Sequence, residues 1–328
     1  MKFVARAALL LGVCATVALI LDTGSAEIFK LLAQAKWWLP WLVPLHALPL
    51  LLDAAGWRML IAAPCSLSKL FWIAAVREGI NRLLPVANIG GEVAGVHLLV
   101  RQRIAAPEAA ASVVVETLLT LVSQSIFASI GLACLIRLAG LAPLTSGILL
   151  SLGLSLPVIF GFATLLKHGS AFQRVERAAG RLSAAFSREG LQFNGRSLDE
   201  AIRRLLASPR RLLRASLWQI LGLLAGSAET WLVLRWLGHP ISAGAAVALE
   251  SLTQAARSIF FVVPAGLGIQ EAGLIGLGRL LGIDAEVAIS LSLAKRLREI
   301  MFGLPALGLW QWWEGRPLRG TTHNHAQS

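Results

Sequence analysis

One short pattern occurs twice in this chain, within sequence that is otherwise apolar enough to lie in lipid. The first copy is Pro85-Val-Ala-Asn-Ile-Gly-Gly-Glu92, and the second is Pro264-Ala-Gly-Leu-Gly-Ile-Gln-Glu271. Proline removes a backbone donor and glycine weakens a helix, so neither copy belongs inside a regular spanning helix. Interrupted backbone at membrane depth must be buried in protein or line a wet cavity. The two copies are therefore predicted to form the two halves of one binding site.

The composition predicts an all-α polytopic membrane protein. Of its 328 residues 56% are hydrophobic and only 15% are charged, and the mean hydropathy is +0.69. The net charge of +12 does not indicate nucleic-acid binding, because the arginines gather between apolar runs and no basic stripe is interleaved with aromatic residues. The three cysteines lack CxxC spacing, and no motif predicts a metal site or a cofactor.

Apolar runs predict the order of the spans. The first, at 7–21, is expected to remain uncleaved, with a cleaved signal peptide as the alternative because small residues follow it. The interrupted regions 66–103 and 241–283 fit either re-entrant pairs of half-length helices, which we favour, or pairs of short full spans. The remaining expected spans are 37–63, 109–138, 141–166, 214–237 and 287–313.

The span 109–138 carries a polar stripe. Its members recur at three to four residues, so they share one helical face, and that face is predicted to look into the bundle. They are Glu116, Thr120, Ser123 and Gln124.

The segment 167–213 differs sharply from its surroundings, since it carries nine arginines. The positive-inside rule assigns it to the cytoplasm, together with both chain termini. Part of it is expected to lie on the anionic leaflet as an amphipathic helix, or else to form a solvated linker. The predicted organisation is one membrane domain, 1–313, with halves at 37–166 and 214–313, followed by a disordered tail at 314–328.

The two halves are predicted to be an inverted duplication. With the basic segment in the cytoplasm, the first interrupted region is entered from inside, after the span 37–63. One further span, 214–237, separates the basic segment from the second interrupted region, which is therefore entered from outside. Inverted repeats with broken helices near the midplane are the architecture of many secondary transporters. A constant offset of 179 positions pairs Trp57 with Trp236, Pro85 with Pro264, Glu92 with Glu271 and Ile104 with Ile283.

Ionisable side chains within the expected spans are the candidate substrate-binding residues, because charges in hydrocarbon either pair or face a cavity. The arginines would bind a lipid phosphate through parallel hydrogen bonds. Glu92 and Glu271 would cap helix amino termini, neutralise arginines or bind a coupling proton. Alternatively, all these charges form internal ion pairs that hold the bundle together. The candidates are Arg77, Arg82, Glu92, Arg257, Glu271, Lys295 and Arg298.

Three motifs resemble those of a known family. They are Gly56-Trp57-Arg58, the Pro-x-x-x-x-Gly-Gly-Glu pattern that ends at Glu92, and Pro-Ala-Gly-Leu-Gly-Ile-Gln-Glu-Ala-Gly from Pro264. Together they are similar to the transmembrane region of the lysylphosphatidylglycerol synthases and their stand-alone, flippase-like relatives, above all those encoded with bacterial hopanoid biosynthesis. The resemblance runs from about Val4 to Trp313.

This resemblance implies a role in lipid movement. In the synthases this region is associated with moving aminoacylated phospholipid across the bilayer, while a separate soluble domain makes the lipid. That domain is not expected here, because the chain ends soon after the last expected span, so synthase activity is not carried over. The resemblance implies a site core of Pro85, Gly91, Glu92, Pro264, Gly266, Gly268 and Glu271.

The expected function is lipid binding and translocation between the leaflets of a bacterial inner membrane, with an anionic phospholipid or a hopanoid or prenyl-type lipid as cargo. An enzyme is not indicated, since HExxH, GxSxG and P-loop motifs are lacking. The alternatives are a non-transporting accessory protein of lipid biosynthesis and a membrane-embedded lipid-modifying enzyme. Expected partners are membrane lipid, the anionic leaflet surface and lipid-biosynthesis enzymes; the oligomeric state is not predicted.

Overall fold

The computed structural model describes residues 38–83, 90–140, 153, 157, 160–167, 195–259 and 268–314. Every regular element in these residues is a helix, which confirms the predicted all-α class for the described part of the chain. Several predicted features lie outside it: the first span at 7–21, Pro85, Pro264, Gly266, most of the span 141–166, the basic residues of 168–194 and the tail from 315.

Three of the helices are much longer than the rest. α6 and α10 have 34 and 28 residues and are long and apolar enough to cross a membrane. At 1.5 Å per residue they measure roughly 51 and 42 Å. α13 has 30 residues but carries a charged middle. In chain order the elements are the short 3-10 helix η1 (Leu39–Trp41), α3 (Leu42–Arg58), α4 (Leu67–Leu83), α5 (Gly90–Arg101), α6 (Ala106–Ala139), α9 (Gly195–Leu206), α10 (Pro209–Trp236), α11 (Ala243–Ile259), α12 (Ile269–Leu280) and α13 (Ala285–Glu314).

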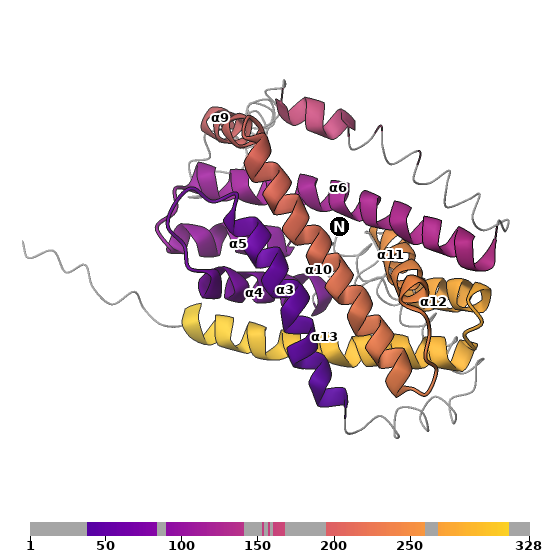
Figure 1. The fold of residues 1–328 in the computed structure, drawn as a ribbon. Coiled ribbons are helices and arrows are strands. Elements are labelled where there is room, and N and C mark those ends of the chain that lie inside the picture. The colour runs from indigo at the N-terminus through magenta and orange to yellow at the C-terminus, as the bar shows by residue number, and fades with distance from the viewer. Residues whose placement is uncertain are drawn as a thin grey trace, which may run out of the picture.

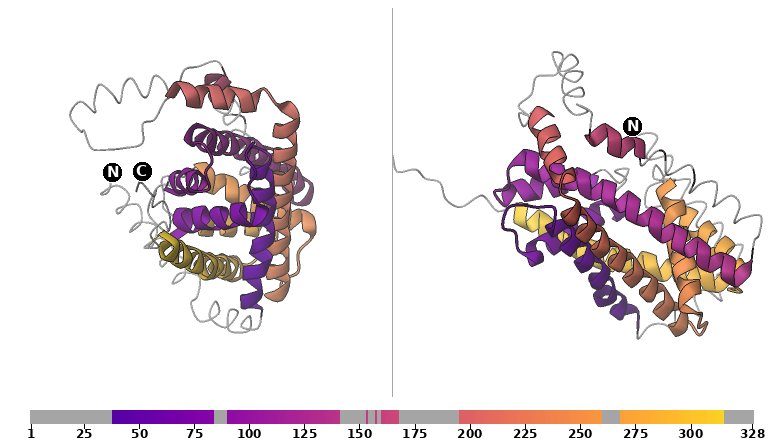
Figure 2. Two further views of the ribbon diagram at one scale, coloured as in Figure 1. Left: turned by 90° about the vertical axis from the view of Figure 1, so that its left-hand side faces the viewer. Right: turned by 45° about the horizontal axis from the view of Figure 1, so that its top comes forward.

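The helices are arranged in two layers (Figure 1). In one layer α6 and α13 run along opposite edges, with α4 and α5 between them near one end and α11 and α12 near the other. α3 and α10 pack side by side and cross this layer, as the left view of Figure 2 also shows. Each interrupted region thus enters the bundle from a different end.

α4 and α5 form an antiparallel hairpin. The Gly91 N–H donates to Asn81 Oδ1 at 2.8 Å, and one turn further along α5 a Cβ on Gly95 would lie only 2.7 Å from Arg77 Cδ. The absence of a side chain at Gly91 and Gly95 therefore lets the two arms approach closely.

α11 and α12 form a second hairpin of the same size. Arg257 Nη1 donates to Gln270 Oε1 at 2.6 Å, and Gly273 lies beside Thr253. In both hairpins the arms have 17 and 12 residues, or roughly 25 and 18 Å. A 12-residue arm is too short for a hydrocarbon core of about 30 Å. The 12-residue arms therefore favour the re-entrant form over pairs of full spans, and that form stays a prediction.

The helix boundaries follow the offset seen in the sequence. α12 begins and ends 179 positions after α5, and α13 begins 179 positions after α6. The long helix that follows each hairpin packs on the hairpin of the other half: α6 packs on α11, and α13 packs on α4. α3 and α10 are antiparallel, because Asp53 lies beside Gly222 and Gly56 beside Gln219. These are the features that an inverted duplication produces, and the inversion across a membrane stays a prediction.

Two apolar clusters fill the bundle and leave a polar layer between them. The first cluster gathers around Trp57, Leu70 and Leu99, and the second around Leu135 and Val233. Along α13 the second cluster ends at Ala294 and the first begins at Phe302. The charged middle of α13 therefore lies between two apolar regions.

α9 is the described helix that lies wholly within the predicted basic segment, and it packs against α6. Leu198 and Ile202 are buried in the first apolar cluster, whereas the side chains of Arg196 and Glu200 are 77% and 51% exposed. α9 is therefore an amphipathic helix docked on the bundle. The residues on which the expected leaflet-bound helix or solvated linker depends lie at 172–182, outside the described residues.

The predicted inversion can be tested with a matched pair of cysteines. Ala105 and Asp284 are exposed, stand 179 positions apart and each immediately precede one of the two equivalent helices α6 and α13. In a protein whose native cysteines are replaced, we expect an impermeant thiol reagent to label Ala105→Cys only from the side of the basic segment and Asp284→Cys only from the other. Labelling of both from one side would contradict the inversion.

Candidate functional site

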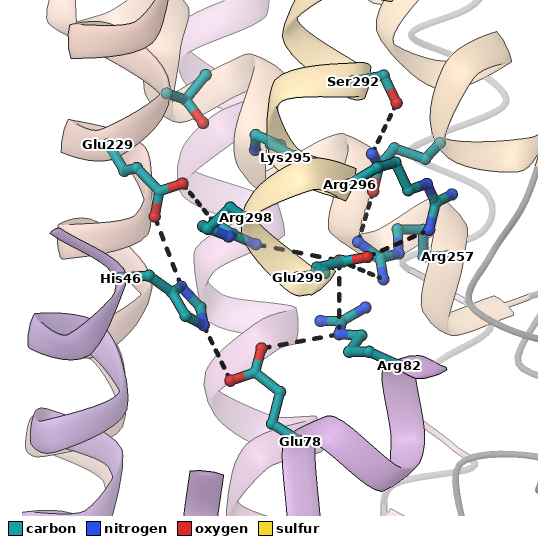
Figure 3. A network of polar contacts seen from close by, with 12 residues as sticks. His46, Glu78, Arg82, Glu229, Arg257, Ser292, Lys295, Arg296, Arg298 and Glu299 are labelled. Carbon is teal, nitrogen blue, oxygen red and sulfur yellow. Dashed lines mark hydrogen bonds and ion pairs between the residues drawn. The ribbon is translucent and has the colours of Figure 1, made fainter. Parts of the chain in front are cut away.

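The polar layer centres on Glu299 at the middle of α13 (Figure 3). Its side chain is only 3% exposed, and its carboxylate is contacted by four guanidinium groups. Oε1 lies 3.7 Å from Arg82 Nε and 3.7 Å from Arg257 Nη2. The other two contacts come from the same helix, with Arg298 Nη2 at 4.0 Å from Oε1 and Arg296 Nη1 at 3.4 Å from Oε2. One buried carboxylate thus joins three helices.

Glu299 is the point where the two hairpins meet. Arg82 lies in the last turn of α4 and Arg257 in the last turn of α11, so each marks the inner end of its hairpin. Arg82 is the more exposed, with 29% of its side chain accessible, and its other acidic neighbour, Glu78, is 3.8 Å away. Arg257 donates its short hydrogen bond to the neutral amide of Gln270. Neither arginine therefore has a close carboxylate partner of its own among these contacts.

His46 of α3 links the layer to the crossing helices. Its Nε2 lies 2.9 Å from Glu78 Oε2, and its Nδ1 lies 3.6 Å from Glu229 Oε2. Glu229 of α10 is paired in turn with Arg298 of α13. His46 was not among the predicted site residues, although an imidazole within an apolar helix was a signal that could have identified it.

Arg77, a predicted phosphate ligand, is enclosed within the first half of the bundle. It is paired with Glu92 of α5 and with Glu116 of α6, the latter at 2.7 Å, and its guanidinium lies 4.4 Å from the ring centroid of Trp57. Trp57 Nε1 donates to Ser112 Oγ at 3.2 Å. Arg77 thereby connects α3, α4, α5 and α6. These contacts are internal ion pairs that hold helices together, the alternative that the sequence left open to ligand binding.

The glutamates of the two repeated motifs have different contacts. Glu271 Oε2 accepts the Gly268 N–H at 2.7 Å, so Glu271 caps the amino terminus of α12, as predicted. Its Oε1 accepts the Ser292 hydroxyl at 2.8 Å and lies 3.4 Å from Arg296. Glu92 instead neutralises Arg77.

Lys295 forms a separate pair with Glu250 of α11. Glu250 also accepts the hydroxyl of Thr230 from α10. The structure therefore gathers Arg82, Arg257 and Arg298 at Glu299, connects Glu271 to this group through Arg296, and places the Arg77–Glu92 and Lys295–Glu250 pairs apart from it.

Two of the predicted motif glycines have a clear steric role. A Cβ at Gly91 would overlap the Arg77 carbonyl and lie 2.7 Å from Asn81 Cγ. Gly268 has φ +78°, a left-handed conformation that favours glycine. Gly91 thus allows α5 to approach α4 closely, and Gly268 allows the backbone to enter α12.

The polar stripe of α6 faces inward, as predicted. Ser123 donates to Gln219 Oε1 of α10 at 3.1 Å, and Gln219 Nε2 donates to Thr120 at 2.9 Å. Gln124 accepts from Ser258 of α11 at 3.1 Å.

The chemistry of this layer is that of anion recognition. Guanidinium groups supply fixed N–H donors, and phosphate and carboxylate oxygens are their natural acceptors. Among the described residues, no group of three or more His, Cys, Asp and Glu side chains is placed to hold a metal ion. The arginines around Glu299 present such N–H donors.

Comparison with known proteins identifies the family. The family model described as "Lysylphosphatidylglycerol synthase TM region" matches residues 4–306. The chain belongs to this family. No curated protein and no solved structure matches it. Membership gives this transmembrane-region protein a membrane role related to lipid, and it does not assign the chain to the subgroup encoded with hopanoid biosynthesis.

The enclosed pairing of Arg77 predicts a large effect on stability. Arg77→Met would leave Glu92 and Glu116 without their cation, and breaking a buried pair in this way typically costs about 3–5 kcal/mol. We expect the free energy of unfolding in mixed micelles to fall by about that amount, and to change little in Arg196→Met, whose side chain is exposed. Equal stability of the two variants would show that Arg77 does not hold these helices together.

Proposed function

We propose that the protein binds the phosphate-bearing headgroup of a membrane lipid at mid-depth and transfers that lipid between leaflets. The observation that carries the proposal is the meeting of Arg82 and Arg257, one from each hairpin, at Glu299. An anionic phospholipid, or a prenyl-type lipid that carries phosphate, suits these groups better than a neutral hopanoid does.

The energetics of the bilayer support this proposal. A charged headgroup cannot cross hydrocarbon unaided, and charged side chains there normally pair or face a cavity. Arg82 and Arg257 have no close carboxylate of their own among the described residues. Their guanidinium groups therefore provide hydrogen-bond donors for the headgroup inside the bundle. Because the hairpins enter from different ends, rocking one against the other would expose this point to each leaflet in turn.

We place the protein in a bacterial inner membrane, with the basic segment on the cytoplasmic side. A row of exposed leucines on α10 would face lipid: Leu213, Leu217, Leu221 and Leu224. At one end of α10, Arg210 and Arg211 follow the basic last turn of α9, and this group would contact anionic headgroups.

A second function is favoured by the cations that already have carboxylate partners within the bundle. Arg77 and Lys295 have carboxylate partners and need no ligand. These pairs would keep the bundle rigid. An accessory protein that holds a lipid for a biosynthetic enzyme, without moving it, would then bind the lipid at Arg82 and Arg257 in one fixed conformation.

Vesicles that contain purified protein and fluorescent phosphatidylglycerol test the two functions. We expect transfer between leaflets to fall about tenfold or more in Arg82→Gln and in Arg257→Gln, because a hydrogen bond to a charged group contributes about 1.5–3 kcal/mol. Arg196→Gln, on the exposed face of α9, is the matched control and should retain the wild-type rate. Wild-type protein that binds this lipid but transfers it no faster than protein-free vesicles would favour the accessory function.

A further inference from the structure

We propose that Glu299 is an internal counter-anion, which holds the two hairpins together in the absence of ligand and which the phosphate of the lipid displaces. The identity of the ligand rests on the proposed function above; the displacement rests on the geometry of the carboxylate itself.

The Glu299 carboxylate is buried but poorly satisfied. Among the residues that the structure describes, Oε1 has no hydrogen-bond partner, although three guanidinium groups lie 3.7–4.0 Å from it. A carboxylate that served only to lock the helices would form short bonds, as Glu229 and Glu116 do with their arginines. Oε1 instead shares its charge among several distant cations.

The two arginines at the hairpin ends, like Glu299, lack a close partner of opposite charge. Within the described part of the chain, Arg82 reaches carboxylates only at 3.7 and 3.8 Å, and Arg257 has one carboxylate at 3.7 Å and one short bond to an amide. Arg298, by contrast, has Glu229 as a close partner. Arg82 and Arg257 are therefore the two arginines of this group with most to gain from a new anion.

A phosphate matches what these two arginines lack. Its non-bridging oxygens can each accept hydrogen bonds from a different guanidinium, which a single distant carboxylate oxygen does not achieve. When the phosphate takes over Arg82 and Arg257, Glu299 keeps Arg296 on its Oε2 side. Displacement therefore leaves no buried carboxylate without a cation.

Exchange of anions also explains how a bound lipid is released. Glu299 remains beside Arg82 and Arg257 and competes with the phosphate for them. The phosphate therefore binds more weakly than it would if the two arginines had no carboxylate beside them. Removing the competitor should strengthen binding and slow release.

The test is the binding of a fluorescent short-chain phosphatidylglycerol to detergent-solubilised protein, followed by fluorescence anisotropy. We expect Glu299→Gln to lower Kd about tenfold or more. The matched control is Glu116→Gln, because Glu116 is also largely enclosed, with a 12% exposed side chain, and pairs with Arg77 and with none of the four arginines at Glu299 in the described structure. It should leave Kd unchanged.

Further variants identify the partners of the phosphate. Adding Arg82→Gln or Arg257→Gln to Glu299→Gln should abolish the gain in affinity. If Glu299→Gln does not fold, Glu299→Asp provides the test: its shorter side chain retracts the carboxylate from both hairpin ends, so a smaller decrease in Kd is expected.

Unchanged or weaker binding in folded Glu299→Gln would overturn the counter-anion role. A gain that inorganic phosphate shows and phosphatidylglycerol does not would overturn the lipid headgroup as the ligand. These outcomes are separable from the proposed function, because they need no transport. Tighter binding in Glu299→Gln with no transfer by wild-type protein would refute translocation alone.

Discussion

Burial of charge within an otherwise apolar helical bundle is the constraint on which the rest of this structure depends. Placing arginines and glutamates inside a bundle that faces lipid is unfavourable unless each charge has a partner or water, so their positions determine how the helices can be joined. Here the charged middle of α13 lies between two apolar clusters, and its contacts reach α4, α10 and α11. The hairpins and crossing helices are thereby fixed to one polar layer.

The two halves of the bundle use this layer differently. At the predicted offset of 179, Glu116 of α6 corresponds to Lys295 of α13, so equivalent positions carry opposite charges. The first hairpin is held by Arg77 between two carboxylates, whereas the second is held by Lys295 and Glu250. In each half these cations have carboxylate partners within the same half or in the crossing helices. Glu299, by contrast, contacts an arginine from both hairpins. Glu299 is therefore the junction on which the proposed movement of one hairpin against the other would act.

The sequence predicted those features that depend on local chemistry. Proline and glycine mark where helices end, so the interrupted hairpins could be anticipated, and the three-to-four-residue spacing on α6 correctly indicated an inward polar face. Pairings between distant residues could not be derived in this way. Arg77 and Arg82 are five positions apart in one helix, yet the first is enclosed by acids and the second meets Glu299. Only the packing of α4 against α5 and α13 distinguishes them.

The most direct test of this account is an experimental structure of the protein in a lipid nanodisc without added ligand. The account predicts that the Glu299 carboxylate lies within about 4 Å of the guanidinium groups of both Arg82 and Arg257, the distance that defines an ion pair. Hairpin ends that lie apart, with Glu299 paired to one arginine only, would contradict it.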